Sequence, residues 1–295
     1  MSDGFRTGTL AIVGQPNVGK STLLNQLIGQ KISITSRKPQ TTRHRVTGIL
    51  TTPVCQYVFV DTPGFQTRHA GALNRVMNRN VTQALADVDV IICVIEAGRY
   101  GPSDRAILKL LPRDRSALLA INKIDRLDDK STLLPFIAQM SQEYPFAEIV
   151  PVSAMTGSGA EQLLSVAALY LPVASPMFGG DEITDRSERF LAAELLREKL
   201  FRNLGEELPY AIAVEIERFE QEGTLRRIFA AIIVEKPAHK PMVIGRGGEK
   251  LKTMSSDARR DMEQLFGGKV YLETWVKVKG GWSDDERALK SLGYE

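Results

Sequence analysis

The eight residues GQPNVGKS, at positions 14–21, limit what this chain can fold into more than any other stretch. They fit the pattern G-x-x-x-x-G-K-[ST] of a phosphate-binding loop. The apolar run 10–13 predicts a buried parallel strand that ends at a glycine, and residues 21–28 predict a helix. Such a loop presents backbone N–H groups and the positive end of a helix dipole to a phosphate chain. An ordinary glycine turn is the alternative, and the flanking strand and helix disfavour it.

The residue types within this loop predict separate roles. Lys20 would reach the β- and γ-phosphates and act as a catalytic residue, while the Ser21 hydroxyl would bind Mg²⁺. We expect nucleotide contacts along the whole loop and the start of the helix, from Gly14, Gln15, Pro16, Asn17, Val18, Gly19, Lys20, Ser21 and Thr22.

Residues 31–45 contain five Lys or Arg residues and no acidic residue, and they include the sequence QTTR at 40–43. Because they lack a steady hydrophobic period, they predict a mobile loop. A nucleotide switch needs such a segment, with a threonine that closes over the γ-phosphate and binds Mg²⁺. Thr42 is the first choice for this catalytic and metal-binding role, and Thr41 is the second. A basic surface loop is the alternative.

The sequence DTPG, at 61–64, follows the apolar run 57–60. The Asp61 carboxylate, at the end of a buried strand, suits a contact to Mg²⁺. The Gly64 N–H can face the γ-phosphate and assist catalysis. We place Thr62 and Pro63 in the same nucleotide site, although D-x-x-G is a weak signal when it stands alone.

The sequence NKID, at 122–125, indicates which base is bound. The Asp125 carboxylate can accept hydrogen bonds from guanine N1–H and from its 2-amino group, whereas adenine has neither donor. A site built on such a bond rejects the wrong ligand by about 10⁴. Asn122 would hold the loops together, and the Lys123 stem would cover the ring. A backbone N–H of Ser153–Ala154 would meet guanine O6. The ligand is therefore predicted to be GTP or GDP rather than ATP.

Apolar strands alternate with helices through the first half of the chain, including a helix at 73–86 and a strand at 88–95. This order predicts an α/β fold with a doubly wound, mostly parallel sheet. Each motif follows a strand, at the edge where ligands bind in open α/β sheets. Residues 8–171 resemble the translation-factor-related class of P-loop GTPases.

One position departs from the Ras-like pattern. Phe65 stands where Ras-like proteins carry the glutamine that orients the attacking water, and Gln66 comes one position late. In similar GTPases with a hydrophobic residue there, the asparagine matching Asn17 helps to hold K⁺ beside the phosphates. The resemblance therefore implies a catalytic role for Asn17 and slow intrinsic hydrolysis. A partner that supplies the missing groups could accelerate the reaction by about 10³–10⁵.

The chain has 295 residues, enough for two domains, and a formal net charge of +3 that indicates no particular partner. It lacks a signal-like start and any apolar run of about 18 residues, so we expect a soluble cytoplasmic protein. Two cysteines and three histidines make a structural zinc site improbable. Prolines and glycines at 172–180 predict a linker. The predicted domains are 1–174, with a linker at 175–183, and 184–295.

The second domain predicts a smaller α+β fold. A helix with an N-cap at Thr184–Asp185 is followed by an alternating strand near 210–216 and a second strand at 225–235. Then come the glycines of 245–248, a helix at 251–266 and a strand at 270–278. The order α-β-β-GxxG-α-β resembles a type II KH domain, in which GxxG clamps about four single-stranded nucleotides. A helix-capping turn is the alternative for GxxG alone.

Basic residues gather at 236–252, which favours a short RNA segment as the ligand. Trp275 could stack on a base, or it could pack in the core or between domains. The RNA-binding candidates are Ile244, Gly245, Arg246, Gly247, Gly248, Lys250, Lys252, Trp275, Lys277 and Lys279.

A single GTPase domain followed by one KH domain, with the sequences ISITSRK at 32–38 and QTTRHR at 40–45, resembles the Era family of bacterial GTPases. The resemblance implies binding to the 3′ end of small-subunit ribosomal RNA and a role in assembling the small ribosomal subunit. It also implies some peripheral association with the cytoplasmic face of the inner membrane, and we expect a monomer. The alternative is a membrane-associated or protein-interaction switch whose KH-like domain binds protein.

Overall fold

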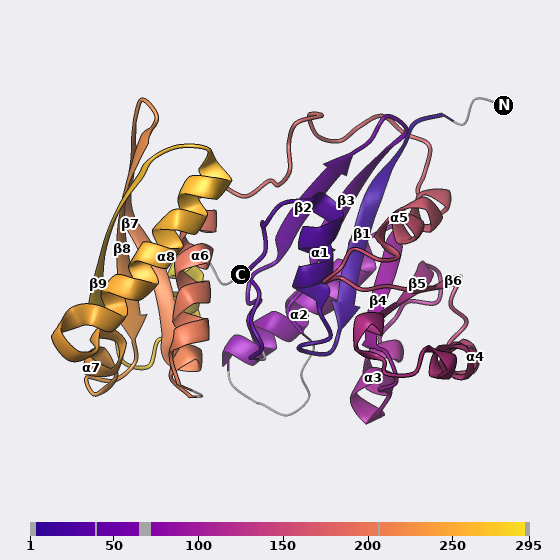
Figure 1. Ribbon diagram of the computed structural model, residues 1–295, viewed down its shortest axis with the longest axis horizontal. Helices are drawn as coiled ribbons and strands as arrows, with labels where there is room; N and C mark the ends of the chain where they lie inside the picture. The colour runs from indigo at the N-terminus through magenta and orange to yellow at the C-terminus, as the bar shows by residue number, and fades with distance from the viewer. Residues whose placement is uncertain (1–3, 39, 65–71, 206, 293–295) are drawn as a thin grey trace. The chain divides into compact units, whose positions relative to one another are not determined.

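The structure is a computed structural model that describes residues 4–38, 40–64, 72–205 and 207–292. The chain divides into two compact units, each with its own sheet (Figure 1). The N-terminal unit consists of Met1–Ser33, Thr42–His69 and Met77–Asp185. The C-terminal unit consists of Arg186–Glu295 together with two earlier segments, Ile34–Thr41 and Ala70–Val76.

The N-terminal unit is built on a six-stranded sheet of order β2-β3-β1-β4-β5-β6. Its strands are β1 (Arg6–Gly14), β2 (Val46–Thr51), β3 (Cys55–Asp61), β4 (Val90–Glu96), β5 (Ser116–Asn122) and β6 (Glu148–Pro151). β2 pairs antiparallel with β3, and the other neighbours pair in parallel. The prediction of a doubly wound, mostly parallel α/β sheet is confirmed. The edge strand β2 was not predicted.

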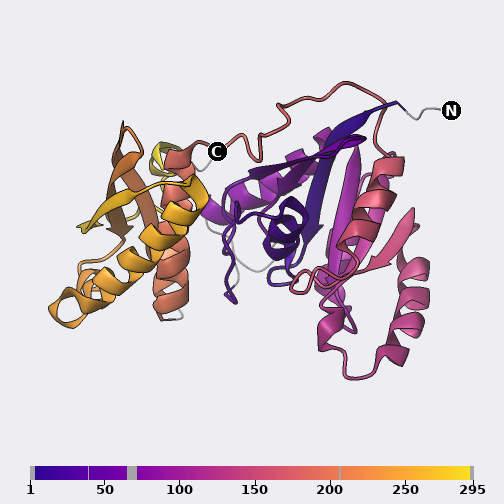
Figure 2. The same ribbon diagram turned by 45° about the horizontal axis from the view of Figure 1, so that its top comes forward.

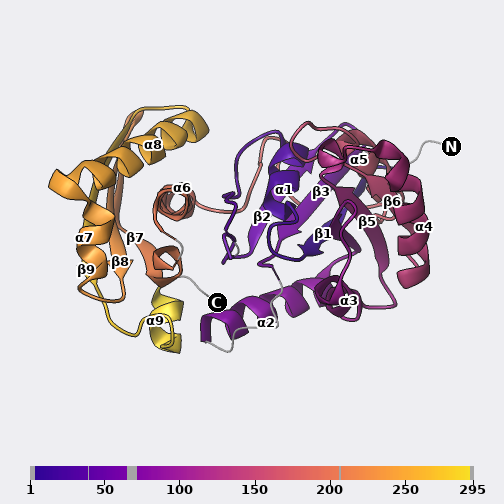
Figure 3. The same cartoon turned by 60° about the horizontal axis from the view of Figure 1, so that its bottom comes forward.

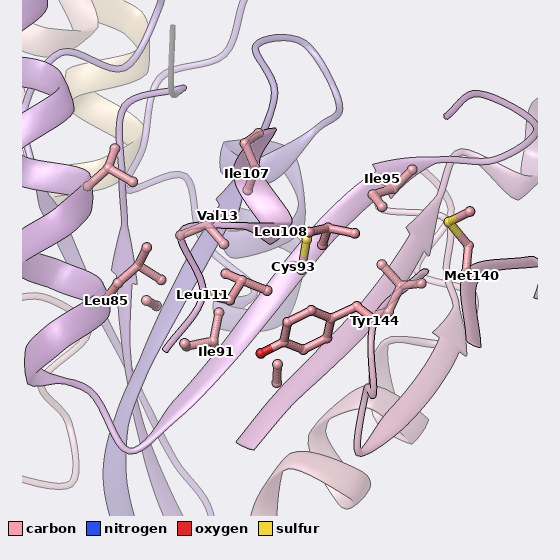
Figure 4. Close-up of a cluster of buried hydrophobic side chains, with 14 of the residues drawn as sticks. Val13, Leu85, Ile91, Cys93, Ile95, Ile107, Leu108, Leu111, Met140 and Tyr144 are labelled. Carbon is pink, nitrogen blue, oxygen red and sulfur yellow. The ribbon is translucent and has the colours of Figure 1, made fainter. Parts of the chain in front are cut away.

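Helices cover both faces of this sheet, which explains why its strands are continuous apolar runs. The helices are α1 (Lys20–Ile28), α2 (Ala72–Asp87), α3 (Pro102–Leu108), α4 (Leu133–Glu143) and α5 (Ala160–Leu169). Figure 3 shows α1 and α5 on one face, with α2 and α3 on the opposite one. Figure 4 shows one core layer, in which Cys93 of β4 lies close to Leu108 within a cluster of buried side chains that also contains Ile107 and Met140. Cys93 is thus a small, buried residue of the core.

The segment predicted as a linker lies along β2 and β3. The Gln56 side chain accepts hydrogen bonds from the backbone N–H groups of Met177 and Phe178, at 2.7 and 3.0 Å. The Thr184 hydroxyl donates to the Thr47 carbonyl at 2.6 Å, so Thr184 is not a helix N-cap. The next helix, α6 (Glu188–Asn203), is capped instead by Ser187. The N-cap predicted at Thr184–Asp185 is therefore wrong.

The C-terminal unit has a three-stranded sheet of order β7 (Ile212–Glu222), β8 (Leu225–Val234) and β9 (Val270–Val278). β7 and β8 are antiparallel, and β8 and β9 are parallel. Leu196 of α6, Met254 of α8 (Glu249–Phe266) and Ile232 of β8 share one core. Figures 1 and 2 both show α8 lying across the strands. The predicted order α-β-β-GxxG-α-β is confirmed, with the short helices α7 (His239–Ile244) and α9 (Glu286–Ser291) in addition.

Among the residues that the structure describes, no helix is both long enough and apolar enough to cross a bilayer.

Candidate functional site

The predicted phosphate-binding loop connects β1 directly to α1, because the strand ends at Gly14 and the helix begins at Lys20. Gly19 is the N-cap of the helix, with φ of 103°, a backbone conformation that favours glycine. A Cβ atom on Gly19 would lie 2.3 Å from Asn122 Nδ2. Asn17 has φ of 65° in the turn of the loop. The loop therefore packs too closely against the base-binding segment for any side chain at position 19.

Lys20 lies inside this loop and is almost completely buried. Its ammonium group donates hydrogen bonds to the carbonyls of Gly14 and Gln15, at 3.0 and 2.9 Å. Burial lowers the pKa of Lys20 to about 8, and the nearby Asp61 carboxylate offsets part of that effect. A phosphate chain would supply the negative charge that this buried cation lacks.

This lowered pKa predicts that nucleotide binding becomes pH-dependent above pH 8. Phosphates beside Lys20 favour its charged form, so the pKa should be higher in the complex than in the free protein. Between these two pKa values, binding takes up a proton, and affinity for GDP falls by up to about tenfold per pH unit. Calorimetry at pH 9, in buffers of different ionisation enthalpy, measures that uptake. Guanosine, which has no phosphates, is the control and should bind without it. Zero uptake with GDP would contradict the prediction.

Three residues predicted to bind the metal meet beside the loop. The Ser21 hydroxyl donates to Asp61 Oδ2 at 2.7 Å and lies 2.8 Å from the Thr42 hydroxyl. Asp61 is fully buried, and its Oδ1 has no hydrogen-bond partner within the described residues. Burial raises the pKa of Asp61, while the bond from Ser21 opposes that rise. Hydroxyl and carboxylate oxygens with one carboxylate oxygen unpaired fit Mg²⁺, which prefers hard oxygen ligands.

Ser33 also belongs to this group, although no motif identified it. Its hydroxyl donates to Asp61 Oδ2 at 2.8 Å, and Ser33 is buried. The side chain of Asn25 on α1 holds this segment by accepting from the backbone N–H groups of Ile32 and Ser33, at 3.0 and 2.9 Å. Ser33 thus donates to the same Asp61 oxygen as Ser21 and helps to orient the carboxylate.

The geometry separates the two threonines proposed for the switch. Thr42 contacts Ser21, whereas the Thr41 hydroxyl donates to the Lys38 carbonyl at 2.7 Å. Residues 32–38 and 40–45 contain no helix or strand, yet Thr41, Thr42 and Arg43 are all buried. This burial is unlike a basic surface loop. The contact with Ser21 favours Thr42 over Thr41 as the residue at the metal position.

The DTPG sequence lies against the phosphate-binding loop. The Thr62 hydroxyl donates to the Ile12 carbonyl at 2.9 Å, which ties the end of β3 to β1. A Cβ atom on Gly64 would lie 3.0 Å from the Pro16 ring. The Gly64 backbone is therefore adjacent to the loop, as a γ-phosphate contact requires. Phe65 and Gln66 lie outside the described residues.

Asn122 joins the two loops that would enclose the base. Its Nδ2 donates to the Val18 carbonyl at 2.8 Å, and its Oδ1 accepts from the Ala154 N–H at 2.9 Å. The Ala154 donor predicted for guanine O6 would therefore have to be shared with Asn122. Asp125 is exposed, and the Ser153 hydroxyl donates to its Oδ1 at 2.6 Å. The carboxylate that would read guanine is thus both accessible and oriented.

Lys123 is held by a residue that the motif analysis missed. It has φ of 66°, and its ammonium donates to Glu96 Oε2 at 2.5 Å. Glu96 is the last residue of β4, so it stands at the ligand-binding edge of the sheet. Its position at a strand end was the one signal available in the sequence.

The GxxG sequence, 245–248, lies between α7 and α8 and includes a 3₁₀ turn, Arg246–Gly248. Gly247 has φ of 58°, and a Cβ atom there would meet nothing within 4 Å. Gly248 begins α8 without a side-chain cap. An open backbone at a helix N-terminus is a suitable contact for a phosphate group.

A groove of about 350 Å³ runs from this loop between α8 and β9. It includes the predicted residues Gly248 and Lys252. Its other lining residues are Leu251, Ser255, Ser256, Arg259, Leu272, Glu273 and Thr274. Residues three or four positions apart share a helix face, so Gly248, Lys252, Ser255 and Arg259 could have been found from helical spacing.

The predicted residues of β9 lie on the other face of the sheet. The Thr274 hydroxyl is 2.8 Å from Ser255 of α8, so the even-numbered residues face the helix. Trp275 and Lys277 alternate with them and point away from the groove. The Lys277 ammonium lies 5.8 Å from the centre of the Trp275 ring and pairs with Glu217. Lys279, just beyond the strand, is exposed. RNA contacts by these three residues stay a prediction.

Comparison with known proteins agrees with this arrangement. Residues 9–123 match the family described as 50S ribosome-binding GTPase, and residues 207–283 match the KH domain. GTPase Era of Nitrosomonas eutropha is 60% identical over 294 residues, which cover 100% of this chain and 99% of that protein. GTPase Era of Chromobacterium violaceum is 55% identical and covers 99% of this chain and 98% of that protein.

Two solved structures of Era resemble the whole chain. One is a variant of Aquifex aeolicus Era bound to GDP·AlF4⁻, and the other is Era with MgGDPNP and nucleotides 1506–1542 of 16S ribosomal RNA. Each has a TM-score of 0.95 and 38% identity, covering 98% of this chain and 99% of the other. Because the similarity extends over the full length, and because the chain has the nucleotide motifs and a C-terminal KH domain, it belongs to the Era family of GTPases.

Proposed function

We propose that this GTPase is a nucleotide-driven switch that binds the 3′ end of small-subunit ribosomal RNA through its C-terminal unit and acts in assembly of the small ribosomal subunit. The observation that carries the proposal is the full-length similarity to Era solved with MgGDPNP and 16S ribosomal RNA nucleotides. The open groove beside the GxxG loop is a physically suitable RNA site in this chain.

In the nucleotide site, each proposed role follows from a contact described above. Lys20 would leave the loop carbonyls to bind the β- and γ-phosphates, together with the backbone of residues 14–22. Asp125, oriented by Ser153, would accept from guanine, and Asn122 would hold the surrounding loops in place. The Gly64 N–H would bind the γ-phosphate. These residues position the nucleotide and stabilise the charge that develops during hydrolysis.

We expect Mg²⁺ to be held by Ser21, Thr42 and Asp61. When bound, the ion would neutralise negative charge on the phosphates. Asp61 would act through its buried carboxylate, with Ser33 keeping that group oriented. Thr42 would join only when the γ-phosphate is present, which makes its segment the nucleotide-dependent switch.

Asn17 is proposed to help hold K⁺ beside the phosphates. The proposal comes from the family resemblance, and the exposed turn position of Asn17 is consistent with it. Turnover at equal rates in potassium and sodium would contradict this role.

In the C-terminal unit, residues 244–248 with Lys250 and Lys252 would contact the RNA backbone. The groove residues Ser255, Ser256 and Arg259 would contact the same strand further along α8. Backbone carbonyls and amides of β9 beside Leu272 and Thr274 would face the bases. Such a groove suits a short single-stranded segment.

We expect Gly247→Asp to weaken binding of the 16S 3′-terminal RNA by about 10- to 100-fold, because it places a negative charge where a phosphate would approach. Asp tolerates a left-handed backbone, and position 247 has open space, so the fold should be retained. The matched control is Gly247→Asn, which has the same shape without the charge. RNA binding is measured by fluorescence anisotropy, and GDP affinity should stay unchanged in both variants.

Retained RNA affinity in Gly247→Asp would contradict the role of this loop. Equal binding of the 3′-terminal RNA and a scrambled RNA would instead favour the second candidate, a membrane-associated or protein-interaction switch. GTP turnover measured with each RNA shows whether RNA binding affects hydrolysis. Stimulation by the 3′-terminal RNA alone would connect RNA binding to hydrolysis.

Three further proposals concern the domain boundaries, the oligomeric state and the cellular location. The functional domains are proposed as 1–174 and 184–295, joined by 175–183. The protein is proposed to work as a monomer in the cytoplasm. Part of it is proposed to associate peripherally with the cytoplasmic face of the inner membrane, which co-sedimentation with anionic lipid vesicles would test.

A further inference from the structure

Lys123, in the base-binding segment of the N-terminal unit, has a backbone conformation that its surroundings must support. Its φ is 66°, in the left-handed region that residues with a Cβ atom adopt uncommonly. It stands between Asn122 and Asp125, the residues expected to hold the base loops together and to read guanine. Such conformations persist where neighbouring groups fix them, and they gather at ligand sites. The contacts that fix Lys123 therefore bear on nucleotide binding.

Glu96, at the end of β4, fixes the Lys123 side chain. The Lys123 ammonium donates to Glu96 Oε2 at 2.5 Å, and each of the two side chains is 18% exposed. A hydrogen bond between two charged groups is short and strong, and salt screens a partly buried pair less than an exposed one. The pair therefore orders a flexible four-carbon stem that would otherwise sample many rotamers.

The Glu96 carboxylate is itself held in place by the sheet and by the turn that follows β4. Glu96 pairs with Asn122 in the parallel register of β4 and β5, and the Ala97 N–H donates to the Asn122 carbonyl at 2.8 Å. In the turn, the Arg99 N–H donates to the Glu96 carbonyl at 3.0 Å, and the Arg99 guanidinium lies 3.4 Å from Glu96 Oε1. One carboxylate oxygen thus pairs with Arg99 and the other with Lys123.

An ordered Lys123 side chain favours binding of a base. Binding costs free energy for each flexible side chain that becomes immobilised, and a side chain that is ordered beforehand avoids this cost. The stem of Lys123 is the part expected to cover the guanine ring, while its ammonium is directed to Glu96. An apolar stem can cover a ring in this way while its charged end is paired elsewhere.

We propose that Glu96 is a positioning residue that sets the rate of guanine-nucleotide release, because it holds Lys123 over the base. The inference rests on the proposed function, since it requires a guanine nucleotide in this site. Affinity differences between related complexes appear mainly in the dissociation rate, so loss of the pair speeds up release. GDP must leave before GTP can enter, and the Glu96–Lys123 pair thus regulates how soon the switch is reset.

The test is Glu96→Gln in the full chain, with release of a fluorescent GDP measured by stopped flow. Gln has the shape of Glu without its charge, and the side chain is partly exposed, so the fold should be retained. Release should become about three- to tenfold faster, which is the effect of ordering one flexible side chain on binding. The matched control is Glu143→Gln, which removes the 2.9 Å ion pair to Arg105 between α3 and α4 and should leave release unchanged. Unchanged release in Glu96→Gln would overturn the inference.

Guanosine distinguishes positioning at the base from a general disturbance of the site. The lost contact is to the base, so the affinities for guanosine and for GDP should fall by the same factor in Glu96→Gln. A disturbance that reached the phosphate-binding loop would weaken binding of GDP more than binding of guanosine. That second outcome would mean that Glu96 does not act through the base, and the inference would be wrong.

Lys123→Ala separates the possible failures. If Lys123→Ala speeds up GDP release and Glu96→Gln does not, the inference about Glu96 is overturned and the role of Lys123 stands. If the unchanged protein does not prefer GDP to ADP, the proposed nucleotide function fails, and the inference fails with it. Adding Glu96→Gln to Lys123→Ala should not speed up release further, because Glu96 acts through Lys123. A further acceleration in the double variant would contradict the proposed pair.

Discussion

Replacing Asp125 by Asn will change the base preference of the nucleotide site from guanine to xanthine. The carboxylate accepts from two guanine donors, whereas an amide presents one acceptor and one donor. Its NH₂ group would face the guanine 2-amino group, leaving two donors opposed, and it would instead pair with the 2-carbonyl of xanthine. We expect GDP affinity to fall by about 10⁴, because a site built to hydrogen-bond one ligand rejects a ligand that lacks the matching group by that factor. Displacement of a fluorescent nucleotide by GDP and by XDP measures both affinities.

Ser153→Ala is the matched control for this change. It removes the 2.6 Å bond that orients Asp125 but keeps both carboxylate oxygens. The expected result is an affinity loss of about tenfold for guanine nucleotides, with guanine still preferred over xanthine. If Asp125→Asn continues to prefer GDP over XDP, Asp125 does not read the base.

The nucleotide site could be predicted from sequence because its parts are local. Ser21 and Asp125 come shortly after a buried strand and Asp61 ends one, and parallel strands bring such ends to one edge of a sheet. Ser33 and Glu96 stand in the same site without a motif of their own. Their roles depend on which segments the fold brings beside Asp61 and Lys123, and that information is tertiary.

The position of the RNA groove could be predicted only in part from the sequence. The alternation of side chains along a strand puts Trp275 and Lys277 on one face of β9, but it does not say which face α8 covers. The apolar residues Val270 and Val276 carried that information, because a strand turns its apolar side to the helix that packs on it. The groove therefore lies on the face of β9 that carries Leu272 and Thr274. The start of α6 also depends on tertiary structure. Thr184 and Ser187 are both good N-cap residue types, but the Thr184 hydroxyl bonds to the Thr47 carbonyl, and Ser187 caps the helix.

Gly19→Ala will separate the phosphate-binding loop from the base-binding loop. The new Cβ atom would lie 2.3 Å from Asn122 Nδ2, at a backbone φ of 103° that alanine rarely adopts. Asn122 must move, and its bonds to Val18 and Ala154 then lengthen or break. We expect the free energy of unfolding to fall by about 2–4 kcal/mol and GDP affinity to fall by about 100-fold, measured by urea denaturation and by titration.

Gly29→Ala at the other end of α1 supplies the matched control. Gly29 also has a left-handed backbone, with φ of 77°, but a Cβ atom there would meet nothing within 4 Å. This variant should lose about 1 kcal/mol of stability and no GDP affinity. Equal effects of the two variants on GDP affinity would mean that backbone strain, not contact with Asn122, explains the loss. In an Asn122→Ala background the amide is absent, so adding Gly19→Ala should lower the free energy of unfolding only by the backbone strain of the alanine.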